Sequence, residues 1–242
     1  MDQLTDRQTQ LLKIVIEDYI SSAKPVGSVE MVANHGLKIS AATVRNEMVR
    51  LIERGLLYKT HSSSGRVPTP TGLRIYLDSL MEEVPLPVLT EVAIKQRLWQ
   101  ERFEFEKFLR KLTLALAENT GYLSFVSTGD EHIFSAGSVN ILNHPEFFDI
   151  EVTRAVLGLL DHEDVLTQIL SKSSGKRDLH VLMGEELGNP NLSQVAIVFS
   201  TVSTFKSPIT FGVIGPIRME YKKALPLLKF FRSLAATLGS AS

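Results

Sequence analysis

The sequence predicts an α+β protein in which a small helical domain, a linker with a long helix and a mixed α/β domain follow one another. Three observations indicate this fold class. Helical periodicity with short capped breaks runs through residues 1–81. A proline-containing linker and a long amphipathic segment occupy residues 82–119. Over residues 120–242, short β-prone runs alternate with helical ones, as expected for a separate domain that buries its own core.

The first domain opens with three predicted helices. Residues 5–22, "TDRQTQLLKIVIEDYISS", carry apolar residues at helical spacing, and Thr5 can cap this helix. The stretch "AKPVG" breaks it, and Ser28 can cap a second short helix that Gly36 ends. Ser40 then caps the third helix.

Two short β-prone pieces follow the glycine that terminates the third helix. They are "LLYKT" and "RVPT", joined by the turn "HSSSG". A further helix starts near Pro70 in "PTGLRIYLDSLME". Three helices and a two-stranded flap predict a winged helix-turn-helix over residues 1–81.

The linker "EEVPLPVLTE" contains Pro85 and Pro87 and therefore cannot continue a helix. Residues 90–119 are predicted to form one long helix that presents Trp99 and Phe103 among its apolar residues. Beyond it, "YLSFVS", "HIFSAGSVNIL", "LHVLM", "SQVAIVFSTV" and "ITFGVIG" are predicted strands, with one or two helices between them and a closing helix. This pattern predicts a largely antiparallel sheet.

Composition narrows the class of protein. The chain has 242 residues and no cysteine, which excludes disulfides, thiolate metal sites and cysteine nucleophiles and fits a reducing cytoplasm. The N-terminus lacks the basic-then-apolar pattern of a signal peptide. No apolar run approaches the roughly 20 residues of a membrane span. We therefore expect a soluble, cytoplasmic protein with no membrane partner.

Charge is distributed unevenly along the chain. The formal net charge is −1, yet one segment, Lys38 to Arg74, has seven cations against two acidic residues, an excess of +5. The cations are Lys38, Arg45, Arg50, Arg54, Lys59, Arg66 and Arg74. A local excess of this kind favours a polyanionic partner more than the overall balance opposes one.

The third helix has two chemically different sides. Its predicted core side carries Val44, Met48, Leu51 and Ile52. The opposite side carries Ala42, Arg45, Asn46, Val49 and Arg50. Arginine reads guanine, asparagine reads adenine, and small apolar side chains contact a thymine methyl group in the major groove. This side of the helix is therefore predicted to read bases in double-stranded DNA.

The turn between the two β-prone pieces supplies hydroxyls and a cation. Ser62, Ser63, Ser64 and Arg66 are predicted to contact phosphates or the minor groove. His61 is placed either at a phosphate or simply in the turn. The complete predicted DNA-binding set is Ser40, Ala42, Thr43, Arg45, Asn46, Val49, Arg50, His61, Ser62, Ser63, Ser64 and Arg66. The competing interpretations are a solvated helix face, a winged helix that binds protein, and a chromatin-type binder without an operator.

Other clusters predict little chemistry. The "DHED" tract at 161–164 and the "DEH" tract at 130–132 contain carboxylates and histidine, but in polar turns such residues are usually solvated rather than metal ligands. The sequence has no nucleophile elbow, phosphate-binding Gly-Lys loop or His-Glu-x-x-His motif. We expect neither a catalytic site nor a metal or cofactor, so the protein is not predicted to be an enzyme.

Several tracts together resemble one family. "LTDRQTQLLKIVIEDYISSAKPVGS", "SAATVRNEMVRLIERGLL" and "HSSSGRVPTPTGLRIYLD" resemble the N-terminal domain of the HrcA-type heat-inducible transcription repressors. "GSVNILNHPEFFD" (137–149) and "GVIGPIRMEYKKALPLL" (212–228) resemble signatures of that family's C-terminal part. The resemblance implies a homodimeric repressor that binds an inverted-repeat operator ahead of chaperone genes. It also implies a GAF-like second domain and support from the GroE chaperonin.

The chain departs from that family in one respect. Members usually carry a long insertion before the "NILNHPEF" signature, whereas only Tyr122 to Val139 fills that space here. The insertion serves dimerisation in the family, so this chain is expected to pair through another surface, with the helix over 90–119 and the GAF-like domain as candidates. The alternative function is a sensor whose GAF-like domain binds a small ligand and whose winged helix engages a protein.

Overall fold

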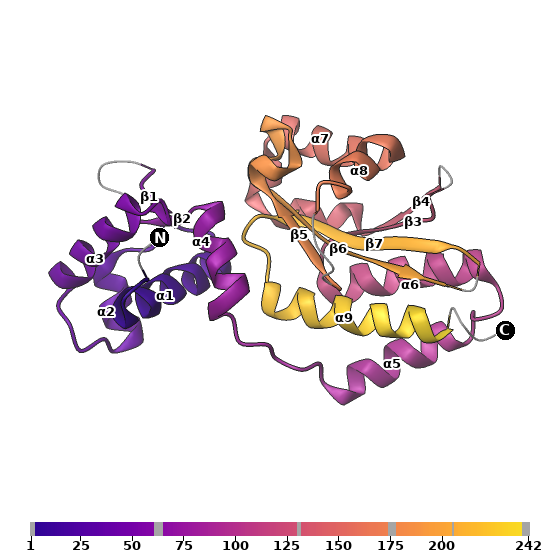
Figure 1. Cartoon of the computed structure of the whole chain (residues 1–242), viewed down its shortest axis with the longest axis horizontal. Coiled ribbons are helices and arrows are strands. Elements are labelled where there is room, and N and C mark those ends of the chain that lie inside the picture. The colour runs from indigo at the N-terminus through magenta and orange to yellow at the C-terminus, as the bar shows by residue number, and fades with distance from the viewer. Residues whose placement is uncertain (1–2, 61–64, 130–131, 174–177, 205, 239–242) are drawn as a thin grey trace. The chain divides into compact units, whose positions relative to one another are not determined.

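The computed structural model divides into two compact units, Met1–Glu82 and Glu83–Ser242 (Figure 1). The residues that it describes are 3–60, 65–129, 132–173, 178–204 and 206–238. Within these ranges, no helix is both long enough and apolar enough to cross a membrane.

The first unit is formed by helices packed around a small two-stranded sheet. Its elements are α1 (Asp6–Ser22), α2 (Ser28–His35), α3 (Ala41–Glu53), β1 (Leu57–Tyr58), β2 (Val67–Pro68), α4 (Pro70–Ile75) and the π-helical turn η1 (Tyr76–Leu80). The predicted capping of α1 is confirmed, because the Thr5 hydroxyl accepts a hydrogen bond from the Gln8 amide while the Gln8 side chain accepts one from the Thr5 amide. The start of α2 differs from the prediction, since Gly27 is the capping residue and Ser28 is buried in the first turn.

The core of the first unit is built mainly from α1 and α3. The α1 side chains Leu11, Leu12, Val15 and Ile16 are fully buried. They meet the apolar side of α3, where Val44, Met48 and Leu51 are also buried. Ile52, which the helical wheel predicts to be in the core, is only half-buried.

The second unit contains a five-stranded sheet with the order β4-β3-β7-β6-β5, and each pair of neighbours is antiparallel. The strands are β3 (Leu123–Ser127), β4 (Ile133–Ala136), β5 (His180–Met183), β6 (Val195–Ser203) and β7 (Pro208–Pro216). Figure 1 shows α6 (Phe105–Thr120) and α9 (Tyr221–Leu238) along one face of the sheet. Helices α7 (Ile150–Asp161) and α8 (Glu163–Leu170) cover the other face and bury Val156 and Leu166 against it. The predicted mixed α/β domain with a largely antiparallel sheet is thus confirmed.

Strand β4 is shorter than the sequence predicts. The run "HIFSAGSVNIL" was expected to be extended throughout, but the strand ends at Ala136. Gly137 follows with a φ of 78°, a left-handed conformation that ends the extended chain. The 3-10 helices η2 (Ser138–Asn143) and η3 (Pro145–Phe148) come next. Further along, η4 (Gly184–Leu187) and η5 (Pro190–Leu192) connect β5 to β6.

The prediction of one long helix over residues 90–119 is wrong. The chain forms α5 (Val88–Trp99), a turn, and then α6 (Phe105–Thr120). The turn lets α5 fold back along α6, where Arg97 pairs with Glu118 and where Ile94 and Leu98 are buried. A continuous helix would hold these two apolar side chains away from α6 and α9, so their burial outweighs helix continuity.

Candidate nucleic-acid interface

Helix α3 presents the side that the sequence predicts to read bases. Ala42, Arg45, Asn46, Val49 and Arg50 are all exposed. Burial of Val44, Met48 and Leu51 on the other side fixes the rotation of the helix, so these five residues face outward together. Arg45 and Asn46 form no side-chain hydrogen bond or ion pair with any described residue, which leaves both donor groups available to a ligand.

Ser40 and Thr43 organise the start of α3. The Ser40 hydroxyl accepts a hydrogen bond from the Thr43 amide at 3.1 Å and lies 3.0 Å from the Thr43 hydroxyl. This is the predicted helix cap. Because both hydroxyls are engaged with each other, their first role is to set where the helix begins.

Glu47 is a component of the site that sequence reasoning missed. Its carboxylate is buried under the exposed side of α3 and accepts hydrogen bonds from the Gln8 amide nitrogen at 3.2 Å and from the Arg50 guanidinium at 3.0 Å. Arg7 approaches it at 4.0 Å. Glu47 and Arg50 are three positions apart, which predicts such a pair, but Gln8 lies on another helix and its approach depends on the tertiary fold. The pairing directs Arg50 toward Glu47, while the Arg50 side chain stays 62% exposed.

Arg66 lies beside the start of α2 and not on a separate hairpin arm. Its backbone exchanges two hydrogen bonds with Val26, at 2.9 and 2.8 Å. Gly65 makes this approach possible, because a Cβ atom at that position would come within 2.6 Å of the Pro25 and Val26 backbone. The chain after the β1–β2 connection is therefore held against the first unit at a fixed point.

A cleft of about 570 Å³ joins these features. Its lining residues are Pro25, Val26, Gly27, Ser28, Val29, Glu30, Arg45, Met48, Lys59, Gly65 and Arg66. Three cations, Arg45, Lys59 and Arg66, come from α3, from the end of β1 and from the start of β2, and a single carboxylate, Glu30, accompanies them. Lys59 was counted in the basic segment of the sequence but was not predicted as a site residue. A cationic cleft beside an exposed Arg/Asn helix face can hold a phosphate chain against that face.

The remaining predicted contacts are those of the β1–β2 connection, and Tyr58, which was not predicted, lies beside it. His61, Ser62, Ser63 and Ser64 lie outside the described residues. Tyr58, next to Lys59, is exposed enough to reach a ligand, and partial burial raises the pKa of its phenol. Tyr58 therefore stays a neutral hydrogen-bond donor at neutral pH.

The histidine–carboxylate tracts of the second unit do not converge on a metal site in the described part of the chain, where no three such side chains gather. Glu163, within "DHED", accepts a hydrogen bond from the Ser127 hydroxyl at 2.5 Å. It therefore ties the first turn of α8 to the end of β3. Asp130 and Glu131 of the "DEH" tract lie outside the described residues.

Comparison with known proteins identifies the family. A family model described as "HrcA protein C terminal domain" matches residues 41–225, well over half of the chain. The chain belongs to the HrcA family. A relative named heat-inducible transcription repressor HrcA, from Acetivibrio thermocellus, is 24% identical and covers 95% of each chain. That alignment spans 332 positions and so exceeds the 242 residues of this HrcA-family chain by 90, which means that the relative holds sequence absent here.

One solved structure shares the fold of this chain. A crystal structure at 2.2 Å resolution, described only as that of a hypothetical protein, superposes with a TM-score of 0.79 at 17% identity and covers 99% of both chains. A structure of HmgR from Pseudomonas aeruginosa gives a TM-score of 0.29 at 16% identity, covering 98% of this chain and 99% of its own. The second likeness is too weak to support any argument.

The two C-terminal HrcA signatures meet in space. Glu146, from the first signature, accepts two hydrogen bonds from the Arg218 guanidinium of the second, at 2.6 and 3.1 Å. The Arg218 and Glu146 side chains are only 9% and 11% exposed. This nearly buried ion pair fastens the η2–η3 segment to the residues that follow β7.

Two aromatic rings complete the junction. Tyr122 stacks on His144 with ring centroids 5.3 Å apart, and its hydroxyl accepts a hydrogen bond from the Glu220 amide at 2.8 Å. Burial, followed by the nearby Arg218 charge, lowers the pKa of His144. The signatures thus mark a buried structural junction in the second unit, distinct from the cationic cleft of the first.

Proposed function

We propose that this HrcA-family chain is a repressor of heat-shock gene transcription that binds an inverted-repeat operator in double-stranded DNA as a dimer. The observation that carries the proposal is the exposed Ala/Arg/Asn/Val face of α3 beside the cleft of Arg45, Lys59 and Arg66. The relative named as a heat-inducible transcription repressor supports heat-shock genes as the proposed targets.

In this proposal the first unit acts as a winged helix-turn-helix. Helices α2 and α3, with the short turn between them, form the helix-turn-helix, and β1 with β2 forms the base of the wing. The antiparallel sheet covered by helices on both faces serves as a GAF-like domain. Support from the GroE chaperonin belongs to the same proposal and follows from the family alone.

The proposed contacts follow from side-chain chemistry. Helix α3 enters the major groove, where Arg45 and Asn46 can each donate two hydrogen bonds to a base edge and Val49 can touch a thymine methyl group. Ser40, Ala42 and Thr43, at the start of the helix, lie closest to the phosphates flanking those bases. Arg50, oriented by Glu47, reaches a neighbouring base or phosphate.

Arg66 and Lys59 then hold the phosphate chain beside α2, and the serines of the β1–β2 connection extend this contact. Repression is steric in this scheme. An occupied operator excludes the polymerase, and loss of the folded dimer on heating frees the promoter.

Protection of DNA by the purified chain tests the proposal. The chain is incubated with the promoter regions of chaperone genes from its own source organism, and nuclease protection is mapped at base resolution. The expected result is a protected site with two-fold symmetry whose protection weakens as the temperature rises. Uniform weak protection, equal on unrelated DNA, contradicts the proposal.

A ligand-sensing function has one observation in its favour. A cleft of about 620 Å³ in the second unit is lined by hydroxyls, one histidine and a few apolar residues. They are Ser127, Thr128, Gly129, Thr167, Leu170, Ser171, Ser173, His180, Phe199, Thr201, Pro208 and Thr210. A metabolite that raises the melting temperature of the chain and changes its affinity for DNA would support this second candidate, and the absence of both effects over a broad metabolite set would count against it.

A further inference from the structure

Helix α5 is apolar on two opposite sides. Ile94 and Leu98 are buried against the rest of the second unit. On the other side, Val88, Val92 and Trp99 are exposed, with Leu89 beside them. Val88 and Leu89 are 72% and 84% exposed. Figure 1 shows α5 as the outermost helix on the α6 and α9 side of the sheet. Val88, Val92 and Trp99 therefore form an exposed apolar stripe on a helix whose other apolar side is buried.

The outer side has the spacing of a helix-pairing seam. Val88, Val92, Lys95 and Trp99 follow one another at intervals of four, three and four residues, which is the spacing of residues that face a second helix. Lys95, the one charged member, carries a long aliphatic stem that can lie on apolar neighbours while its ammonium group stays in water.

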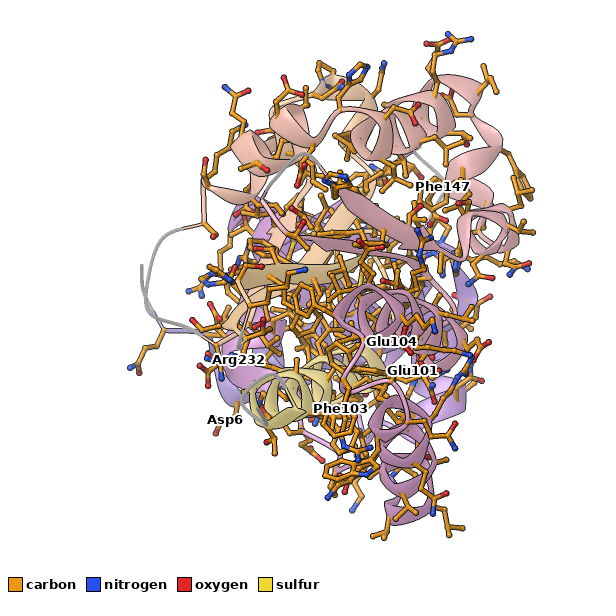
Figure 2. All side chains as sticks on the ribbon, turned by 90° about the vertical axis from the view of Figure 1, so that its right-hand side faces the viewer. Asp6, Glu101, Phe103, Glu104, Phe147 and Arg232 are labelled. Atoms are coloured by element: carbon orange, nitrogen blue, oxygen red, sulfur yellow. The ribbon has the colours of Figure 1, made fainter. Side chains whose placement is uncertain are left out.

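The C-terminal end of α5 carries a rigid aromatic knob. The Arg102 guanidinium lies 4.5 Å from the Trp99 ring centroid and 4.1 Å from that of Phe103, and it donates a hydrogen bond to the Trp99 carbonyl at 2.7 Å. Phe103 is nevertheless 72% exposed. Figure 2 shows it with Glu101 and Glu104 at the corner where α5 gives way to α6.

The other end of the same helix borders a groove of about 350 Å³ between α5 and α6. The groove is lined by Leu89, Thr90, Ala93, Ile94, Arg97, Ala115 and Asn119. The α5 members of this lining point mainly toward α6, so the groove lies apart from the exposed side that carries Val88, Val92 and Trp99.

We propose that the outer side of α5 is the surface through which two copies of this chain pair, with the two helices antiparallel. Trp99 of one copy packs beside Val88 and Leu89 of the other, and Val92 faces Lys95. The proposal rests on the proposed function in one respect: a two-fold operator needs a two-fold protein, and the extra sequence of the longer relative is missing here.

Charge favours the antiparallel arrangement. Where Val92 of one copy faces Lys95 of the other, the adjacent Glu91 comes near that lysine, and symmetry repeats the pair. In a parallel arrangement Lys95 would face Lys95, which places like charges together. Neither Glu91 nor Lys95 forms an ion pair with another described residue of its own chain. Both charges are therefore available to a second copy.

Sedimentation of the full chain without DNA tests the surface by charge reversal. Lys95→Glu places a carboxylate against Glu91 of the other copy, and Glu91→Lys places two cations together. Each single variant is expected to raise the dimer dissociation constant at least about tenfold, whereas the double variant Glu91→Lys with Lys95→Glu restores it to within about threefold. Circular dichroism checks that each variant is folded.

The matched control is Leu142→Glu, which puts the same charge on another exposed apolar position of the second unit and should leave the dimer intact. Three outcomes would contradict the proposed pairing surface. The wild-type chain could stay monomeric, the single variants could remain dimeric, or only Leu142→Glu could lose the dimer. Operator binding is scored separately. If Lys95→Glu abolishes the dimer but the wild type binds no operator, the proposed function fails alone. If Lys95→Glu binds the operator normally as a dimer, the surface is wrong and the proposed function stands.

Discussion

The carboxylate of Glu47 lies beneath the exposed side of α3 and links a glutamine of α1 to an arginine of α3. It accepts hydrogen bonds from Gln8 on α1 and from Arg50 on its own helix. A flexible arginine loses rotamer freedom when it binds a base, and a fixed partner removes part of that cost in advance. Under the proposed function, Glu47 would therefore act on DNA binding through Arg50 without touching DNA.

Arg45→Ala and Asn46→Ala are expected to weaken binding to the operator far more than binding to scrambled DNA. Each good bidentate base contact discriminates by about 1–3 kcal/mol, and neither side chain is needed to hold the described fold together. Gel-shift titrations with the two DNAs at one salt concentration measure the difference. Equal losses on both DNAs would refute a base-reading role.

Arg66→Ala is the matched comparison, because a phosphate contact has no sequence preference. It should weaken binding to both DNAs alike and reduce the magnitude of the slope of log affinity against log salt by about 0.9. A loss of selectivity with an unchanged slope would instead make Arg66 a base reader.

His144 is expected to make the second unit sensitive to mild acid. Burial and the Arg218 charge lower its pKa in the folded chain, so below about pH 6.5 the unfolded chain takes up a proton that the folded chain does not. Stability should therefore fall as the pH drops through this range and level off below the folded-state pKa.

Urea unfolding of the wild type and of His144→Phe, between roughly pH 7.5 and 5.5, measures this effect. The variant keeps an aromatic ring against Tyr122, and the His144 Nε2 atom is buried without a hydrogen-bond partner among the described residues. The free energy of unfolding of His144→Phe should fall less on acidification than that of the wild type. Parallel losses in the two proteins would show that other groups carry the pH dependence.

The η2–η3 segment is held to the end of β7 by the Glu146–Arg218 pair. Glu146→Leu is expected to destabilise the second unit by about 3–5 kcal/mol, because it removes the carboxylate that forms an ion pair with a nearly buried guanidinium. Replacing both members with apolar residues should cost less than either single change. Urea unfolding measures the free energy of unfolding of the two single variants and of the double variant.

The control for that series is the exposed pair of Arg154 and Glu151 on α7, whose side chains are 69% and 52% exposed. Arg154→Met should change stability by less than about 1 kcal/mol. Similar losses at both pairs would mean that burial does not set the difference.

Most elements follow from local sequence, since Thr5 and Ser40 cap the starts of α1 and α3, Gly55 follows the end of α3, and short β-prone runs predict the strands. The α5–α6 turn was missed because the apolar periodicity continues through it, and only packing of α5 back on α6 reveals the break. The exposed face of α3 was predicted because it depends on one helix. Glu47 and the docking of Arg66 on Val26 were not, because each depends on contacts between segments distant in sequence.

Two paired chains make a geometric demand on the DNA. Two copies of α3 can enter the major groove together only if the half-sites lie on one side of the duplex, about 10 base pairs apart or a multiple of that. Insertion of about five base pairs between the half-sites rotates one of them to the opposite side. We expect a large loss of affinity from that insertion and partial recovery when a full turn is inserted, measured by gel shift. Indifference to the insertion would indicate independent binding of single chains.

The exposed apolar stripe of α5 also affects how steeply transcription of the repressed genes depends on the concentration of folded chain. Under the proposed pairing through this single helix, the pairing energy is modest, so chains and pairs would exchange at ordinary cellular concentrations. Below the pairing constant, occupied DNA varies with the square of the free chain concentration, so a twofold fall in folded chain lowers occupancy about fourfold. Unfolding of a small fraction of the molecules on heating would then cause a larger change in transcription, without the need for a separate temperature-sensing site.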